Sequence, residues 1–490
     1  MSKGAIKIKL VTIKFKHVTG GFTNTVKYVT IILSSLPNNI SIDLEEKMNK
    51  SVLKLEVSPV DSNKAIGPVR SHLYSFSMAQ KMRIDGFDVK CIIKCDDSDP
   101  KKHKKQNFRE VYDFLSTLGV KADIHPYNSD EVLGCSLFQS ERGQIYSKYL
   151  ERLLDSGFVS LADDSRLTTL DVKKFVQNFG SKIIANDELL GDLSFELGNI
   201  FKDGKTNFPL TRSDGSCLFN LISVADDLEL GVTHVIRGQD KIHVIPVQEM
   251  IRMVLGVSSP VYIHLPLLCS ENGKRTGGYI QFDELEKSGI SMPALISYAL
   301  SSGYGNPDGI FFSLEEFIAQ FDLKNVHKIN TNFCKARLEN INKRMSRILT
   351  SSQYWQTVQC YAAQYYDSQK TEKIMKDENV QHFLDELRLP PAESIDLVNR
   401  IFFPKETPID HALVNCVKQV VEKLKSNPEF DTLSISFAHF SKDVFSKSLR
   451  WILIRETGGV ELKKIFSLLR EKGLISKRIN CTEEALGQSF

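Results

Sequence analysis

The sequence predicts an α/β domain built around a parallel sheet, followed by an all-helical region. Strand and helix patterns alternate from residue 52 to residue 118, and a second block of this kind runs from residue 208 to residue 268. After residue 321 the chain shows long amphipathic stretches and few strand signals. Strands and helices that alternate at this spacing form parallel sheets, which bind ligands at the carboxyl ends of their strands.

The first block contains two expected strands, each followed by an expected helix. Residues 52–57 and 87–94 form apolar runs typical of buried strands. After each run, apolar residues recur at the spacing of one helix face. They are Val69, Leu73 and Phe76 after the first strand, and Phe108, Val111, Tyr112, Leu115 and Leu118 after the second.

The second block repeats this pattern, and the helical region follows it. We expect strands at residues 233–236 and 261–265, with a helix at about residues 247–255 between them. Further along, Pro390 and Pro391 are expected to separate two helical units, because proline interrupts a helix.

Composition limits the possible classes of protein. The chain has 490 residues, of which 42% are hydrophobic and 25% charged, and its net charge is only +3. A nucleic-acid partner would therefore have to be met by local basic patches. Of the nine scattered cysteines only Cys91 and Cys95 lie close together, so we expect reduced thiols and no structural zinc or other metal site. No apolar run approaches the roughly 20 residues that span a bilayer, so no membrane contact is expected.

Residues 1–47 differ in composition from the rest. Up to Ile42 there are six lysines and no acidic residue, and the pattern is typical of strand. We interpret this segment as an extension outside the fold, because Met48 directly precedes the first expected strand. A targeting segment and a genuine added arm are the alternatives.

Four short patterns in residues 208–268 point to a known family. R-x-D-G-S, V-x-D-D, G-V-T-H-V-I-R-G and H-L-P-L-L occur there in order. Together they closely resemble the second half of the catalytic domain of bacterial-type glutamyl-tRNA synthetases, which are class I enzymes. The resemblance extends upstream through residues 139–157 and downstream through residues 313–333. Residues 448–465 resemble the anticodon-binding end of that family.

The resemblance implies a fold and a set of partners. It implies a Rossmann-like class I catalytic domain over residues 48–323, with an acceptor-stem domain inserted at 131–207. A helical connector or first anticodon-binding unit would occupy 324–390, and a second helical anticodon-binding unit 391–490. The partners implied are tRNA, glutamate, ATP and Mg²⁺, in protein biosynthesis. We expect a cytoplasmic monomer, with an organelle matrix as the alternative location.

Two motifs that bind ATP phosphates in this family are altered. Ala65 stands where the resemblance places the first histidine of an H-I-G-H-like motif, and Ala65 cannot donate a hydrogen bond. Gly67 is kept, and Pro68 is expected at the first helical position. Lys274 and Arg275 resemble the end of a K-M-S-K-S-like loop that is shortened here and lacks its first lysine. A simple surface turn at these two residues is the alternative.

The amino-acid pocket implied by the resemblance is altered too. Lys54 replaces an arginine that grips the substrate side-chain carboxylate, and Glu56 stands where the family has a small residue. A carboxylate at this position would repel glutamate, or would simply pair with Lys54. The other matching substrate-binding positions are Ser58, Asp96 as the amino-group ligand, Phe219 in place of a tyrosine, Ser223 and Arg237.

Two histidines and two aspartates are given structural roles. We expect His243 and His264 to serve in packing or hydrogen bonding rather than as ligands. Asp226 and Asp227 lie in a region that resembles the family's acceptor-end region, although an acidic pair of this kind is typical of loops and helix caps.

Two functions remain open from the sequence. The first is a divergent glutamate–tRNA ligase that uses ATP and Mg²⁺, which the family resemblance favours. The second is a catalytically inactive pseudo-synthetase that binds tRNA or serves as a scaffold. The lost histidine at Ala65, the shortened loop and Glu56 favour impaired or lost catalysis. A changed substrate is a third, minor alternative.

Overall fold

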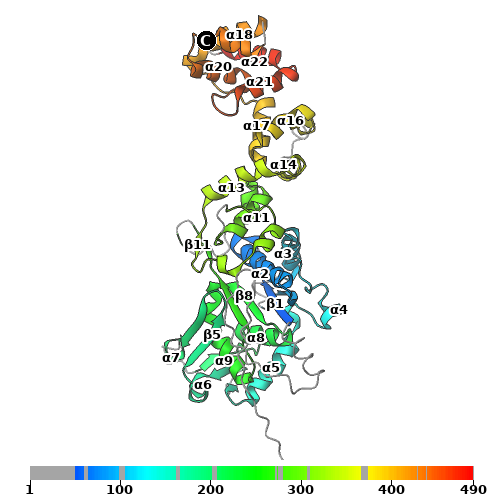
Figure 1. Ribbon diagram of the computed structural model, residues 1–490, viewed down its shortest axis with the longest axis vertical. Coiled ribbons are helices and arrows are strands. Elements are labelled where there is room, and N and C mark those ends of the chain that lie inside the picture. The colour runs from blue at the N-terminus through cyan, green and yellow to red at the C-terminus, as the bar shows by residue number, and fades with distance from the viewer. Residues whose placement is uncertain are drawn as a thin grey trace, which may run out of the picture.

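The computed structural model describes most of the chain after residue 49. The described ranges are 50–59, 64–98, 105–161, 166–200, 207–270, 273, 280–305, 309–365, 373–426, 429–437 and 439–488. The extension expected at residues 1–47 lies outside them. Figure 1 shows an elongated molecule, with the sheet toward one end and the last helices at the other.

A six-stranded sheet carries the first half of the molecule, in the strand order β2-β1-β8-β9-β5-β6. Neighbouring strands are parallel up to β5, and β6 pairs antiparallel at the edge. β1 is buried almost throughout, as expected for a parallel strand that is covered on both faces. The strands are β1 Lys50–Val57, β2 Asp88–Cys95, β8 His234–Gly238, β9 Val261–Leu265, β5 Lys182–Asp187 and β6 Gly191–Glu196.

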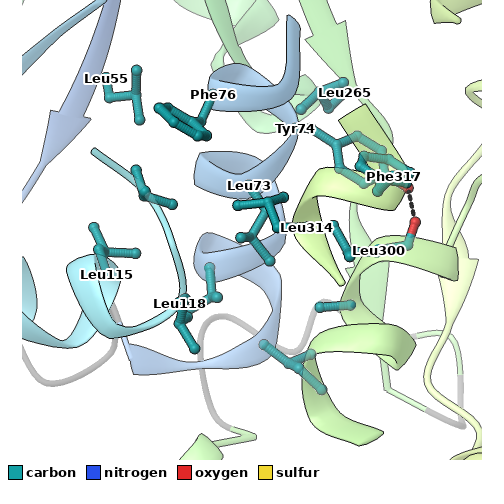
Figure 2. Close-up of a cluster of buried hydrophobic side chains, with 14 of the residues drawn as sticks. Leu55, Leu73, Tyr74, Phe76, Leu115, Leu118, Leu265, Leu300, Leu314 and Phe317 are labelled. Carbon is teal, nitrogen blue, oxygen red and sulfur yellow. Dashed lines mark hydrogen bonds between the residues drawn. The ribbon is translucent and has the colours of Figure 1, made fainter. Parts of the chain in front are cut away.

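One face of the sheet packs against α2 and its neighbours. Leu53, Leu55 and Val57 of β1 share a core with these helices. Figure 2 shows Leu73 and Tyr74 of α2 in this core, where the Tyr74 hydroxyl donates a hydrogen bond of 2.8 Å to the Leu300 carbonyl. The helices that contribute are α2 Ile66–Ile84, α3 Lys105–Thr117, α10 Phe282–Lys287, α11 Met292–Ser301, α12 Leu314–Gln320 and α13 Lys335–Ile348.

A second core holds α5 Gly143–Asp155, α6 Val172–Phe179, α8 Phe219–Glu229 and α9 Ile245–Leu255. It includes a small antiparallel sheet of β3 Val159–Leu161, β4 Thr168–Asp171 and β7 Asn207–Pro209. β5 and β6 fall within residues 131–207, the insertion expected from the sequence, yet they extend the six-stranded sheet. Short elements complete this half: α4 Ser129–Leu133, η3 Gln139–Glu141, α7 Leu197–Ile200, η4 Gln239–Val244, β10 Leu268–Cys269, η5 Leu323–Asn325 and β11 Thr331–Asn332.

The last part of the chain is helical and has its own core, which begins at Tyr354. None of the helices in the described part of the chain combines the length and the apolar character needed to cross a membrane. The helices of this part are α14 Ser351–Tyr365, α16 Glu378–Leu387, α17 Pro391–Phe402, η6 His411–Leu413, α18 Val414–Ser426, α19 Phe430–Ser436, α20 Lys442–Ile454, α21 Leu462–Glu471 and α22 Ile475–Gln488.

The predicted fold class is confirmed, and one local prediction is wrong. Every strand and helix expected in the two α/β blocks is present. Pro390 precedes α17 and Pro391 begins it, and the helices on both sides of these prolines share one core. Pro68, however, is the third residue of α2, because the helix already begins at Ile66. Its missing N–H still costs the helix nothing, since the first-turn N–H groups have no partner within the helix.

Candidate active site

Lys54 lies on the face of β1 opposite the α2 core, because side chains alternate along a strand. It is buried, and its Nζ contacts two carboxylates. One is Asp227 on α8, which accepts a very short hydrogen bond, and the other is Glu56, whose Oε1 is 3.0 Å away. The predicted alternative, in which Lys54 and Glu56 pair with each other, is therefore confirmed.

Lys94 brings a second ammonium group to the same place. The parallel register sets Lys94 of β2 beside Glu56 of β1. Its Nζ is 3.1 Å from Glu56 Oε1 and 2.6 Å from Asp226 Oδ2. Asp226 also accepts bonds from Arg142 Nε at 2.7 Å and from the Tyr146 hydroxyl at 3.1 Å. Both oxygens of the Asp226 carboxylate thus accept hydrogen bonds from buried side chains.

Asp227 also connects Lys54 to a second ion pair, formed by Arg252 and Glu249. Arg252 of α9 donates from a terminal nitrogen to Asp227 Oδ2 at 2.6 Å, and its Nε lies 3.6 Å from Glu249 Oε1. The Tyr262 hydroxyl donates to the same Glu249 oxygen at 2.6 Å. The interpretation of Asp226 and Asp227 as loop or cap residues is wrong, because both lie within α8 on its buried side, where basic partners meet them.

These contacts form one connected set, which we call the buried charge network. Its charges cancel, because four basic groups face four carboxylates. Of the eight side chains, seven are at most 4% exposed, and Glu56 is 23% exposed. The members are Lys54, Lys94, Arg142 and Arg252, with Glu56, Asp226, Asp227 and Glu249.

The network favours the charged forms of Glu56 and Lys94. Burial alone would raise the pKa of the Glu56 carboxyl, but Lys54 and Lys94 overcome this effect and hold that pKa well below its usual range. Burial would likewise lower the pKa of the Lys94 ammonium, yet Asp226 and Glu56 raise it instead.

Ser58 and Asp96 lie together at the carboxyl ends of β1 and β2. Ser58 Oγ is 3.4 Å from Asp96 Oδ2, and Ser98 Oγ is 3.4 Å from the other carboxylate oxygen. The Asp96 backbone N–H donates to the Val57 carbonyl at 2.9 Å, which fixes the position of the residue. This is the edge at which parallel α/β sheets bind ligands.

Arg237 of β8 lies in a separate polar group. It donates from Nε to His264 Nε2 at 3.1 Å and from a terminal nitrogen to the Gln248 side-chain oxygen at 3.1 Å. Because a guanidinium can only donate, His264 must carry its proton on Nδ1, which lies 2.7 Å from Asp187 Oδ2. Burial lowers the pKa of His264, in agreement with this neutral form. The hydrogen-bonding role expected for His264 is confirmed.

Phe219 and Ser223 lie one turn apart on α8. Phe219 is its first residue and is half-buried, with the Lys241 ammonium 5.5 Å from the ring centroid. Ser223 is buried. A hydroxyl at the ring's outer end is absent in phenylalanine, so Phe219 offers a ligand only an apolar edge and face.

The start of α2 offers few donors to a phosphate. Ala65 is the N-cap residue and makes no side-chain capping bond, and the Ile66 N–H already donates to the Ile280 carbonyl at 2.9 Å. Pro68 has no N–H, so Gly67 supplies the remaining donor of residues 66–68. The space beside Gly67 is open, since a Cβ there would meet no atom within 4 Å. Lys274 and Arg275 lie outside the described residues.

Apart from the pairing of Lys54 with Glu56, the sequence did not reveal the contacts of the buried charge network. Lys94 and Asp226 are 132 positions apart, so their contact could not be read from local spacing. A signal was nevertheless present, because Lys94 interrupts an apolar strand and a buried lysine needs a carboxylate partner. Within the described ranges no group of three or more His, Cys, Asp or Glu side chains is placed to hold a metal ion. A Mg²⁺ ion that enters with nucleotide phosphates does not require such a group.

Comparisons with known proteins agree with this architecture. The family of class I tRNA synthetases (E and Q), catalytic domain, matches residues 63–170 and 172–340. A glutamate–tRNA ligase from Methylacidiphilum infernorum is 29% identical over 311 residues, which cover 62% of this chain and 66% of that protein. The chain thus spans just under two thirds of the length of this relative.

Two solved structures share the fold. The glutamate-tRNA synthetase of Elizabethkingia anophelis matches with a TM-score of 0.68 at 18% identity, over 89% of this chain and 100% of that one. A glutamate tRNA ligase from Elizabethkingia meningosepticum, solved in complex with its amino acid, has a TM-score of 0.66 at 17% identity, over 89% and 99%. The family match covers more than half of the chain. The chain belongs to the class I tRNA synthetases (E and Q), as a member of the glutamyl-tRNA synthetase family.

Proposed function

We propose that this chain is a tRNA-binding member of the glutamyl-tRNA synthetase family in which the activation of glutamate with ATP is impaired or lost. One observation carries the proposal. Lys54, at the position that resembles the family's carboxylate-binding arginine, is already neutralised by Glu56 and Asp227. A substrate carboxylate would add an uncompensated negative charge to a buried, balanced set, which is costly.

The phosphate side of the site supports the same proposal. Ala65 supplies no side-chain donor, and of the first three residues of α2 only Gly67 has a backbone N–H without a partner among the described residues. Preorganised donors of this kind contribute roughly 3–4 kcal/mol each to the transition state. Their loss slows adenylate formation while the sheet and helices of the fold stay intact.

A divergent but active ligase is the second candidate. Ser58 and Asp96 are held at the carboxyl edge of the sheet, as an amino-group site requires. Arg237 uses Nε and one terminal nitrogen, and its other terminal nitrogen is not part of these two bonds. On this alternative, Arg237 would bind a substrate carboxylate and ATP would enter with Mg²⁺ beside Gly67.

ATP–pyrophosphate exchange with glutamate and tRNA distinguishes the two. Loss of two donors at about 3 kcal/mol each gives a rate lower by about four orders of magnitude than that of an active family member. Ala65→His alone should not restore exchange, because Glu56 remains on Lys54. Exchange at the rate of an active glutamate–tRNA ligase, assayed in parallel, would instead establish the active-ligase alternative.

The tRNA part of the proposal has its own test. Affinity for tRNA comes largely from phosphate contacts, which do not depend on adenylate chemistry. We expect binding at micromolar or better concentrations at low salt, with a steep loss as salt rises. A gel-shift titration at two salt concentrations measures both, with an unrelated RNA of equal length as control. Equal affinity for the two RNAs would refute tRNA recognition and favour a protein partner.

A further inference from the structure

Glu56 differs from the other seven members of the buried charge network. Its Oε1 atom lies between two ammonium groups, 3.0 Å from Lys54 Nζ and 3.1 Å from Lys94 Nζ. Both lysines are almost completely buried, whereas 23% of the Glu56 side chain is exposed. Glu56 therefore separates the two lysines from solvent, and it is the member that can be removed without opening a sealed cavity.

The rest of the network holds the two lysines in place without Glu56. Lys54 keeps its bond to Asp227, and Lys94 keeps its bond of 2.6 Å to Asp226. β1 lies between β2 and β8 in the sheet, and β2 pairs with β1 along its whole length. Without Glu56, four basic groups would face three carboxylates, so the vacated volume would carry an excess positive charge.

We propose that Lys54 and Lys94 form a carboxylate-binding site that is filled by the chain's own Glu56. The carboxylate of Glu56 takes the place that a small carboxylate ligand would take, and so excludes it. The ligand class is a small carboxylate, because the two ammonium groups supply positive charge and hydrogen-bond donors and the space is that of one Glu56 carboxylate. This inference deepens the proposed function, on which it rests, by naming Glu56 as the residue that sets specificity at Lys54.

Chemical complementation of Glu56→Ala tests the site directly. The substitution removes Cγ and the carboxylate, which are together the atoms of acetate. We expect the variant to melt at a higher temperature in sodium acetate than in sodium chloride of equal ionic strength. With a dissociation constant of about 10 mM, about 100 mM acetate would raise the folding equilibrium constant about tenfold. If the variant unfolds in chloride, recovery of its circular dichroism in acetate gives the same information.

Matched controls separate a site from a general salt effect. Acetamide has the shape of acetate without its charge and should not stabilise Glu56→Ala. The unmodified protein should not respond to acetate, because its site is filled. Glu110→Ala removes an exposed carboxylate from an ion pair with Lys64, and should gain nothing from acetate either.

Glu56→Gln keeps the volume of the side chain and removes its charge. We expect this variant to be less stable than the unmodified protein and to be insensitive to acetate, because no space is vacated. Stability equal to that of the unmodified protein would overturn the proposal, as would equal melting of Glu56→Ala in acetate, acetamide and chloride. Neither assay uses ATP or tRNA, so these results are independent of the exchange and gel-shift tests of the proposed function.

Discussion

Lys94 carries a fully buried positive charge on a strand whose neighbouring residues are apolar. Its ammonium is stable there because Asp226 and Glu56 face it directly. Such groups contribute little when the whole pair is replaced by apolar residues, but removal of one partner leaves an isolated buried charge. At the residue scale, the stability of this site therefore depends on each buried charge keeping its partner, and not on the number of ion pairs.

Lys94→Met should lower the free energy of unfolding by about 3–5 kcal/mol, since Asp226 is then buried with one basic partner fewer. Urea denaturation measures the loss. The matched control is Lys64→Met, which removes an ion pair with Glu110, a side chain that is 70% exposed. That change should stay within about 0.5 kcal/mol. Equal effects of the two substitutions would show that the network adds nothing to stability.

His72 of α2 makes the folding stability of the protein depend on pH. Burial lowers the pKa of His72 to about 4. In the unfolded chain a histidine titrates near 6.5, so between these values the unfolded state binds the proton more strongly. Stability is therefore complete above pH 6.5 and falls as the pH drops toward 4, by up to about 3 kcal/mol from this residue.

His72→Leu should flatten this part of the stability curve, measured by urea denaturation at pH 7, 6, 5 and 4.5. The control is His382→Leu, because the His382 side chain is 80% exposed and should leave the slope unchanged. His234 and His264 also titrate lower when folded, so a residual slope is expected in both variants. An unchanged slope in His72→Leu would contradict the assignment.

At the element scale, α2 is anchored by a buried arginine. Arg70 donates from Nε to the Ser302 carbonyl and from a terminal nitrogen to the Pro266 carbonyl, both at 2.6 Å. Its guanidinium also lies 4.7 Å from the centroid of the Tyr74 ring. A single side chain thus joins α2 to the ends of α11 and β9.

Arg70→Met should destabilise the protein by about 2–4 kcal/mol, because two buried carbonyl groups lose charged donors. Arg70→Lys should recover only part of the loss, since one ammonium cannot reproduce the planar fork that reaches both carbonyls. Thermal unfolding distinguishes the variants. Arg109→Met is the control, because Arg109 pairs with Asp113 on the exposed surface. Full recovery by lysine would argue against the geometric explanation.

The elements differ in how far the sequence predicts them. The sequence predicts β9 at its observed bounds, because a short apolar run with β-branched residues is typical of a buried strand. β6 was not predicted, since Gly191–Glu196 is mostly exposed and carries no continuous apolar pattern. Within the site, the Lys54–Glu56 contact follows from strand alternation alone. The contacts of Lys94 with Asp226 depend on how distant elements pack, and no local spacing encodes them.

At the scale of the whole molecule, the chain has separate cores before and after a short junction. The first large core continues through Leu338, Ile341 and Met345 of α13, and the helical core begins at Tyr354. We therefore propose a division near residue 350. A fragment that ended at Leu323, the boundary predicted from the sequence, would expose the α11 surface that α13 covers.

Calorimetry tests this division. We expect residues 351–490 to fold alone, because their core is complete, and to reproduce one of two thermal transitions of the full chain. Residues 48–350 should reproduce the other. Across the junction the Tyr365 hydroxyl contacts Glu286 at 3.1 Å, the Tyr361 hydroxyl donates to the Lys287 carbonyl at 3.2 Å, and Ala392 lies close to Gly289. Because the two cores are otherwise separate clusters, we expect each transition to shift only slightly. A single transition in the full chain would show that the two parts unfold together.

The electroneutrality of the network also constrains how this sequence can change. Glu56→Ala leaves one ammonium in excess, and Lys94→Met leaves one carboxylate in excess, whereas the double variant is balanced again. In a double-mutant cycle, the double variant should therefore lose less free energy of unfolding than the two single variants lose together, by about 2 kcal/mol or more. Replacement of Glu56 by a small residue therefore lowers stability unless a bound ligand or a second substitution restores the charge balance. The order of substitutions therefore decides whether an open pocket can form at Lys54 without a loss of stability.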